Sequence, residues 1–279
     1  MATLLLIRHG RTTANAGGLL AGRTPGVELD DHGRAQAAAL GLRLAGVPLA
    51  AVVSSPLERT RQTSAALLDA RVPGAGPDPA AKAAAPADPH APAADPDAAP
   101  AKPARRRTAR AAAAPEPIPL HLEDRINECD YGHWAGRELK ILAKEPLWPV
   151  VQNHPSAVTF PGGESMTRMS ARAVEAVRDW NEQLGPEACY AMVSHGDVIK
   201  AIIADALGMH LDLFQRIQVD PCSVTVIRYT QMRPFLLRIN DTDSPVGTLV
   251  PARSKARSGR RRPDGDAQIG GGSGAPAAR

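Results

Sequence analysis

Apolar residues gather along this chain in short continuous runs, separated by longer segments in which they recur every three or four positions. Three runs, at Thr3–Arg8, Ala50–Ser54 and Cys189–Ser194, are apolar without alternation, which predicts strands buried on both faces of a sheet. Two later runs, Ser223–Thr230 and Phe235–Asn240, alternate more and predict an antiparallel hairpin or a pair of edge strands.

The segments between the runs predict helices. We expect them at Asp31–Ala45, from Pro56 to about Asp69, at Met166–Leu184, and at Asp197–Leu207 with a stop at Gly208. The first helix would be capped by Asp30 or Asp31 and would carry on one face Ala35, Ala38, Ala39 and Leu42. The third shows helical spacing at Met166, Met169, Ala173, Val177, Trp180 and Leu184.

The alternation of strands with helices decides the predicted fold class. A further, very short strand is expected at Leu120–Leu122. Strands that alternate with helices are typical of a parallel sheet covered on both faces. We therefore predict an α/β fold, a three-layer α/β/α sandwich with a mainly parallel sheet.

Two segments differ in composition from the rest of the chain. Residues 73–117 hold 19 Ala and 11 Pro among 45 residues, and residues 250–279 are rich in Gly, Ser and Arg. Neither composition offers the apolar surface that a core needs, so we expect a disordered insertion and a disordered basic tail. The other 204 residues of the 279 would form a single domain spanning residues 1–249 around the insertion.

The formal net charge of +4 belongs mostly to the tail. The tail holds 7 Lys and Arg against 2 Asp and Glu, the insertion 6 against 5, and the remaining residues 20 against 22. A basic cluster of this kind is a solvated extension more often than a recognition surface. We therefore do not expect the folded part to bind nucleic acid.

Cysteine count and hydropathy exclude two further classes. Three cysteines without paired spacing are not a disulfide framework, and no apolar run approaches the ~20 residues that span a bilayer. The start, Met1–Arg8, has no basic leader and too short an apolar stretch for a signal peptide. We expect a cytoplasmic protein with no membrane partner.

Candidate chemistry lies where the first predicted strand ends, at Arg8-His9-Gly10. In open α/β sheets, ligands bind beyond the carboxyl ends of the strands. A glycine there lets its backbone N–H approach an anion, and Arg8 offers a cationic fork that suits phosphate. The alternative is that His9 is a structural histidine, capped by a neighbouring carbonyl.

Two more strand ends carry similar chemistry. Ser194-His195-Gly196 precedes a helix, whose N-terminal N–H groups favour an anion. Ser54-Ser55-Pro56 precedes another helix, and Arg59 in its first turn can point back at the same anion. Two His-Gly strand ends favour a phosphate site over two unrelated structural histidines, although a lone arginine in a first turn is usually solvated.

Five motifs follow one another along the chain: Arg8-His9-Gly10-x-Thr12-x-x-Asn15, Ser54-Ser55-Pro56-Leu57-x-Arg59, Glu128-x-x-x-Gly132-x-Trp134-x-Gly136, Pro161-Gly162-Gly163-Glu164-Ser165 and Ser194-His195-Gly196. In this order they resemble the histidine phosphatase (phosphoglycerate mutase-like) superfamily, and most of all an actinobacterial branch named as phosphomutases or broad-specificity phosphatases. The resemblance covers the 204-residue core and neither low-complexity segment.

The resemblance implies a role for each matching residue. His9 would be the nucleophile that becomes phosphohistidine, with Arg8, Arg59 and His195 around the phosphoryl oxygens. Glu128 would protonate the leaving alkoxide and then activate water; the alternative is that it pairs with Arg125. The full expected phosphate-binding set is Arg8, Gly10, Thr12, Asn15, Gly22, Arg59, His195 and Gly196.

Other polar and aromatic residues receive weaker expectations. Glu164 is expected to answer a helix dipole, the alternative being that it orients the substrate or an arginine. Arg11 and Arg23 either grip a second acidic group of the substrate or are solvated, and we favour solvation. Trp134 is expected to pack under a lid of roughly residues 129–165. Surface or structural positions are expected for His133, His154 and His210.

The sequence thus predicts a phosphomonoester hydrolase that acts through a phosphohistidine on a small phosphorylated metabolite, with no metal and no cofactor. One alternative is a phosphomutase of the phosphoglycerate mutase type; the resemblance implies a longer lid for such mutases, so the short connection here favours hydrolysis. An alternative of another class is an inactive phosphate-binding module whose basic tail binds a polyanion. The substrate and the oligomeric state, a homodimer included, stay open.

Overall fold

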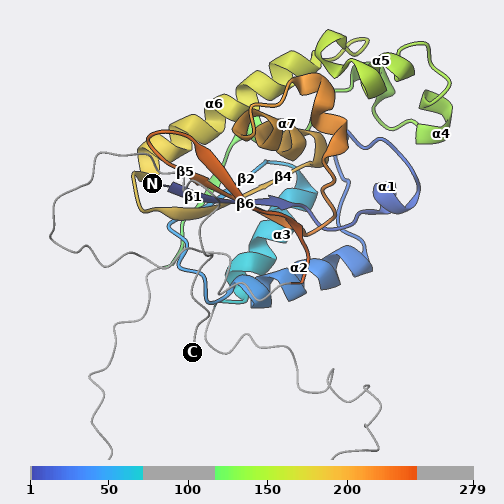
Figure 1. Cartoon of the computed structure of the whole chain (residues 1–279). Coiled ribbons are helices and arrows are strands. Elements are labelled where there is room, and N and C mark those ends of the chain that lie inside the picture. Colours follow the sequence, from blue (N-terminus) through green and yellow to red (C-terminus); the bar gives the residue numbers. More distant parts are fainter. Residues whose placement is uncertain (1, 72–116, 244–279) are drawn as a thin grey trace, which may run out of the picture. The chain divides into compact units, whose positions relative to one another are not determined.

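The computed structural model describes residues 2–71 and 117–243 (Figure 1). By its contacts the chain divides into one unit of Met1–Val72 with Ile118–Arg279 and a second unit of Pro73–Pro117. Residues 73–116 of the predicted insertion, the predicted tail and the predicted domain boundary at 249 lie outside the described residues. Within the described ranges, no helix has the length and apolar character needed to cross a membrane.

A mixed sheet of six strands lies at the centre of the first unit, in the order β3-β2-β4-β1-β5-β6. The strands are β1 (Ala2–Arg8), β2 (Val52–Ser54), β3 (Leu120–Leu122), β4 (Cys189–Ser194), β5 (Val224–Tyr229) and β6 (Pro234–Asp241). The first four run parallel, whereas β5 runs antiparallel to β1 and β6 antiparallel to β5. The predicted strands and the mainly parallel sheet are confirmed, although β2 begins two residues later than expected.

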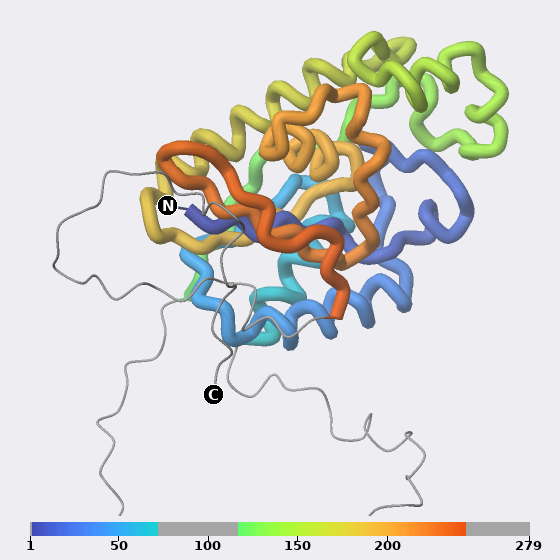
Figure 2. Tube along the Cα trace, viewed as in Figure 1, coloured from blue at the N-terminus to red at the C-terminus, as the bar shows by residue number. Residues whose placement is uncertain are grey.

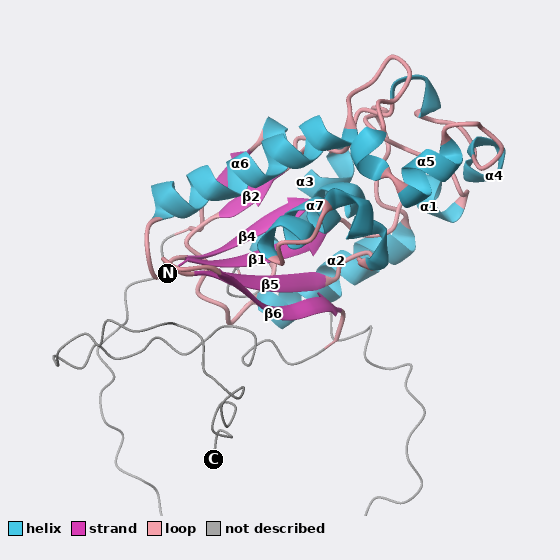
Figure 3. Ribbon diagram, turned by 45° about the horizontal axis from the view of Figure 1, so that its top comes forward, coloured by secondary structure: helices cyan, strands magenta, loops and turns pink. Residues whose placement is uncertain are grey.

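Helices cover both faces of the sheet, which confirms the three predicted layers (Figures 1 and 3). The longer ones are α2 (Asp31–Leu44), α3 (Glu58–Asp69), α6 (Met166–Leu184) and α7 (Gly196–Ala206). Leu5 and Ile7 of β1 pack in one core with α2 and α3, while Leu4 and Leu6 pack in the other with α6 and α7. Successive side chains of β1 therefore enter opposite cores, as strand geometry requires.

Short helices build the region beyond the strand ends. They are α1 (Thr13–Ala16), α4 (Leu139–Leu142) and α5 (Trp148–Asn153), and 3-10 turns lie at Asp124–Ile126, Gly132–Trp134, Pro155–Ala157 and Leu211–Arg216. The lid segment, residues 129–165, is tied to the loop after α1, because Leu139 N donates to Gly18 O at 2.9 Å. In the tube view, the loop with α1 and the lid segment lie at the same side of the sheet (Figure 2).

The buried face of α2 differs from the one predicted. The face that carries Ala35, Ala38, Ala39 and Leu42 is exposed, and Leu42 itself is 49% exposed. The helix instead turns Gly33 and Gly41 toward its neighbours, where a Cβ would overlap the carbonyl oxygens of Arg11 and Ala66. The same buried face carries Ala37, Leu40 and Leu44, so the prediction chose the wrong apolar face of the helix, and the two glycines allow the close backbone approach.

Two helix starts also differ slightly from expectation. α3 begins at Glu58 with Leu57 as its N-cap, so Pro56 precedes the helix instead of opening it. α7 begins at Gly196, one residue earlier than predicted, with His195 as its N-cap. As a result, the backbone passes from the end of β4 into a helix at the residues expected to meet an anion.

Candidate active site

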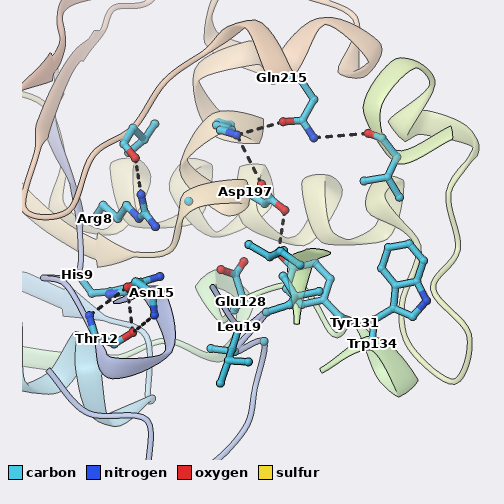
Figure 4. A pocket seen from close by; sticks show the side chains of 18 of the residues that line it. Arg8, His9, Thr12, Asn15, Leu19, Glu128, Tyr131, Trp134, Asp197 and Gln215 are labelled. Carbon is cyan, nitrogen blue, oxygen red and sulfur yellow. Dashed lines mark hydrogen bonds and ion pairs between the residues drawn. The ribbon is translucent and has the colours of Figure 1, made fainter. Parts of the chain in front are cut away.

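Three strand ends meet at one cavity of about 540 Å³. β1 contributes Arg8 and His9, the turn after β2 leads to Arg59 in α3, and the turn after β4 leads to Gly196. Glu128 lines the same cavity from the connection after β3 (Figure 4). Because parallel strands end at one edge of the sheet, residues far apart in the sequence share this wall.

The hydrogen bonds of His9 decide which of its ring nitrogens is basic. Nδ1 lies 2.7 Å from the carbonyl oxygen of Gly10, which can only accept, so Nδ1 carries the proton. Nε2 accepts from Arg59 Nε at 3.3 Å and therefore holds the lone pair. The carbonyl cap on Nδ1, which was the structural alternative, therefore also leaves the lone pair of His9 on Nε2, the nitrogen that faces Arg59.

Burial and charge both keep His9 neutral. Burial lowers the pKa of His9 well below its ordinary value, and the charges of Arg59 and Arg8 lower it further. The hydrogen bond to the Gly10 carbonyl raises this pKa by a smaller amount. A neutral imidazole is the nucleophilic form. The sequence indicated the two cations, whereas the larger cause, the burial of His9, became evident only in the folded structure.

Both guanidinium groups at the cavity hold a buried N–H without a protein partner. Arg59 is 1% exposed, and its Nη2 donates to Gly22 O at 2.7 Å. Arg8 Nη1 donates to Val219 O at 2.6 Å. Neither Arg59 Nη1 nor Arg8 Nε makes a hydrogen bond with any described residue. A buried donor without a partner costs about 1–3 kcal/mol, which an anionic oxygen would offset.

His195 lies beside His9, with ring centroids 5.2 Å apart, but it does not line the cavity. Its Nδ1 accepts from Arg59 Nη2 at 3.2 Å, and its Nε2 therefore donates to Ser55 Oγ at 2.8 Å. Burial, followed by the charge of Arg59, lowers the pKa of His195 well below its ordinary value, so this ring is also neutral. Donation to a phosphoryl oxygen requires the bond to Ser55 to be exchanged, and that role stays a prediction.

The three glycines of the expected set make different contacts. Gly10 N–H donates to Thr63 Oγ1 at 3.1 Å and Gly10 does not line the cavity, so the expectation that this N–H faces an anion does not hold in this structure. Gly22, with a φ of +53°, lines the cavity and holds Arg59 by its carbonyl. Gly196 lines the cavity at the N-terminus of α7.

Thr12 and Asn15 bind each other at the cavity wall. Asn15 Oδ1 accepts from Thr12 Oγ1 at 2.9 Å and from Thr12 N at 3.1 Å, and Thr12 Oγ1 accepts from Asn15 N at 3.1 Å. These bonds cap α1 and leave the Nδ2 group as the side-chain donor of Asn15. Thr12 therefore orients Asn15, while its own hydroxyl is occupied.

Glu128 is buried between His9 and Tyr131 in the view of Figure 4. Burial and the charge of Asp197 raise the pKa of Glu128 to about 7, against the opposing charges of Arg59 and Arg8. The sequence-based alternative, an ion pair with Arg125, is wrong: Arg125 pairs with Glu123 and Asp179. A carboxyl with this pKa is present in both protonation states near neutral pH.

An ion-pair cluster behind Glu128 holds its backbone. The carbonyl of Glu128 accepts from Arg23 Nε at 2.8 Å and from Arg172 Nη2 at 3.1 Å. Glu164 pairs with both arginines, at 2.9 Å and 2.6 Å. Glu164 thus orients two arginines behind Glu128, neither of which lines the cavity, so the alternative of an arginine in the pocket is met only in part, and Arg23 is engaged. Arg11 likewise pairs with Asp30 at 2.8 Å instead of reaching a substrate.

Sequence reasoning missed a polar chain that runs along α7 beside Glu128 (Figure 4). Tyr131 OH donates to Asp197 Oδ2 at 2.7 Å, and Lys200 Nζ lies 3.8 Å from Asp197 Oδ1. Lys200 also donates to Gln215 Oε1 at 3.1 Å. The available signal was the position of Asp197, which directly follows the His-Gly strand end in the first turn of α7.

The remaining candidates divide into packing and surface residues. Trp134 is 3% exposed and packs against Phe160 with ring centroids 5.4 Å apart, as predicted for a residue under the lid segment, and it also lines the cavity. Exposed positions are occupied by His133, His154 and His210. In the described part of the chain, no cluster of three His, Cys, Asp or Glu side chains could hold a metal ion.

Comparison with known proteins identifies a family whose model matches this chain. Residues 4–79 and 92–242 match the family model described as the histidine phosphatase superfamily (branch 1). The chain is 26% identical over 255 residues to phosphoserine phosphatase 1 of Hydrogenobacter thermophilus, covering 87% of this chain and 93% of the relative. It is 41% identical over 214 residues to the adenosylcobalamin/alpha-ribazole phosphatase of Salmonella typhimurium, covering 74% and 80%.

A solved structure shares the fold. The structure of Bacillus stearothermophilus YhfR aligns with a TM-score of 0.67 at 22% identity, covering 87% of this chain and 98% of that one. At this level of identity the likeness concerns the arrangement of strands and helices. The α/β architecture built around the cavity is therefore shared with this solved structure.

Proposed function

This chain belongs to the histidine phosphatase superfamily (branch 1), and from that premise we propose that it hydrolyses small phosphomonoesters through a phosphohistidine on His9. One observation carries the proposal. The Nε2 lone pair of a buried, neutral imidazole lies beside Arg8 and Arg59, each of which holds a buried N–H without a protein partner. The imidazole suits attack on phosphorus, and the guanidinium groups suit the oxygens that carry charge in the transition state.

In the first half-reaction, His9 Nε2 forms a bond to phosphorus while the ester P–O bond breaks. Arg59 Nε, which donates to Nε2 at 3.3 Å, turns to a phosphoryl oxygen and so releases the lone pair. The departing alkoxide takes a proton from Glu128, because a pKa of about 7 keeps much of this carboxyl protonated at neutral pH. The free alcohol then leaves.

The second half-reaction uses the same residues in the opposite direction. Glu128, now a carboxylate, accepts a proton from water as the water oxygen bonds to phosphorus. The N–P bond breaks and its electron pair returns to Nε2 of His9. Phosphate leaves, and both side chains regain their starting protonation states.

The two alternatives differ from this proposal in what becomes of the phosphoryl group. A mutase shares the first half-reaction and then delivers the group to a second hydroxyl of the substrate instead of to water. A module that only binds phosphate has no need of a protonated carboxyl beside a neutral imidazole. The raised pKa of Glu128 therefore supports an enzyme over a binding module.

The expected setting follows from the same features. Both named relatives are phosphatases by name, which supports a small phosphorylated substrate. All three cysteines of the chain are buried thiols without a disulfide, which supports a reducing compartment, and we propose a cytoplasmic enzyme. The resemblance of the five motifs to an actinobacterial branch supports an actinobacterial source. We propose no nucleic-acid partner for the folded part.

The test is a panel of phosphomonoesters with the full chain and its His9→Ala variant. We expect free phosphate from the wild type, none above background from His9→Ala, and a phosphorylated His9 in rapidly quenched samples kept out of acid. Isomerised product without free phosphate would identify a mutase. Equal phosphate release by His9→Ala would overturn the mechanism.

A further inference from the structure

The cavity extends well beyond the residues that handle a phosphoryl group. In Figure 4, His9 and Arg8 lie on one side of Glu128, while Tyr131 and Trp134 lie on the other. Trp134 is one of a set of apolar residues that line the cavity, called here the aromatic wall: Leu19, Leu139, Trp134, Trp148, Val151 and Phe160. A cavity of about 540 Å³ has the size of sites that enclose ligands larger than a three-carbon ester.

The aromatic rings of this wall pack against one another. Trp134 stacks on Trp148 with ring centroids 6.2 Å apart and an interplanar angle of 25°. Phe160 meets Trp134 edge-on at 5.4 Å and Tyr131 at 5.0 Å. Rings held by one another in this way offer a defined apolar surface instead of a mobile one.

The charges around the cavity do not favour a second acidic group on the substrate. Apart from Arg8 and Arg59, the cation that lines the cavity among the described residues is Lys200, and Lys200 is held by Asp197 and Gln215. Arg23 and Arg11 have partners elsewhere and do not line the cavity.

Acidic side chains line this space as well. Asp197 and Asp220 line the cavity in addition to Glu128. A carboxylate placed beside Tyr131 would meet Asp197, which binds the Tyr131 hydroxyl, and the cation next to Asp197 is Lys200, which is already held. Like charges brought together in a partly buried site cost binding energy.

We infer that the alcohol part of the preferred substrate is a bulky apolar or aromatic group without a carboxylate, seated against the aromatic wall. This inference rests on the proposed phosphatase function and adds the class of its leaving group. Transfer of an apolar group from water onto this wall supplies the binding, while Arg8 and Arg59 hold the phosphoryl group.

The test compares esters that share a primary alkoxide leaving group, so that their chemistry is matched. We would measure kcat/KM of the full chain for 2-phenylethyl phosphate, ethyl phosphate, 3-phosphoglycerate and O-phosphoserine. One methylene in a hydrophobic pocket changes kcat/KM by about tenfold or more, so we expect at least about a tenfold preference for the phenylethyl ester over ethyl phosphate. The two carboxylated esters should fall at or below ethyl phosphate.

Variants locate the preference on the wall. Trp148 is partly exposed, so Trp148→Ala should fold, and it should reduce the phenylethyl-to-ethyl ratio by roughly twofold to tenfold. Trp148→Leu, which keeps an apolar side chain, should retain more of the ratio. Met232→Ala removes an apolar side chain that is 64% exposed and outside the cavity, and it should leave the ratio unchanged.

The outcomes distinguish a failure of the leaving-group preference from a failure of the phosphatase function. Phosphate release that depends on His9 but shows no phenylethyl preference, or a preference for a carboxylated ester, overturns the inference and leaves the phosphatase proposal standing. A preference that Trp148→Ala does not alter also overturns it, since the wall would then not be its source. No His9-dependent turnover of any ester would instead remove the proposed function.

Discussion

The protonation state of Glu128 should set the alkaline limb of the pH profile. Because burial and Asp197 raise its pKa to about 7, the protonated form needed for the first half-reaction is lost as the pH rises through 7. His9 adds no acid limb in this range, since burial and the two arginines hold its pKa well below the ordinary value and the ring stays neutral as the pH falls from 7 to 6.

The pKa of Glu128 sets the size of the expected loss of kcat/KM at alkaline pH. One pH unit above a pKa, roughly one tenth of a group is still protonated, so kcat/KM for an alkyl phosphate should fall roughly tenfold between its plateau and pH 8. Removing the acid entirely by Glu128→Gln should cost about 10²–10⁴-fold. Asp197→Asn removes a charge that raises the pKa of Glu128, so the alkaline limb should move to lower pH.

The assay is kcat/KM for 2-phenylethyl phosphate from pH 5 to 9, because kcat/KM reports the steps up to the first irreversible one. The same profile with 4-nitrophenyl phosphate is the control, since its stable leaving group needs little protonation and should weaken the limb and the Glu128→Gln defect together. If both esters lose the same factor in Glu128→Gln, or if Asp197→Asn leaves the limb in place, Glu128 is not the acid tuned in the way described here.

Three further predictions concern single contacts. Arg59→Lys keeps the charge but loses the bonds to its neighbours, so kcat/KM should fall by about a hundredfold or more in the phosphate-release assay; a loss under tenfold would contradict its placement. Glu164→Gln should lower kcat by roughly tenfold to a hundredfold with little change in KM, because Glu128 loses its backbone support, while Glu175→Gln on the exposed face of α6 should have no effect. Gly33→Ala should destabilise the fold by about 1–3 kcal/mol or more in thermal unfolding, whereas Gly46→Ala, with open space at its Cβ, should stay within about 0.5 kcal/mol; equal effects would refute the packing argument for α2.

Apolar runs and strand-end motifs were sufficient to predict the central strands and the residues at their ends. Continuous runs at Thr3–Arg8 and Cys189–Ser194 predict buried strands, and in the structure these two strands are neighbours that pair in parallel, in the register that begins with Thr3 and Cys189. Parallel strands end at one edge of a sheet, which favours a shared site for the His-Gly pairs that follow them, and His9 and His195 do lie side by side. The local sequence predicts these buried strands because a continuous apolar run of a few residues is enough to indicate a strand covered on both faces.

Contacts between distant segments settled what the site residues do. That Nε2 of His9 holds the lone pair, that Gly10 N–H is taken by Thr63, and that Asp197 acts on Glu128 all follow from hydrogen bonds and charges across the fold. The burial of His9 and Glu128 could not be predicted from the sequence, because the effect of desolvation on a pKa depends on all the segments packed around the group. The sequence by itself determined which chemical groups reach the edge of the sheet, and the tertiary structure decided their partners, their protonation and the apolar wall they face.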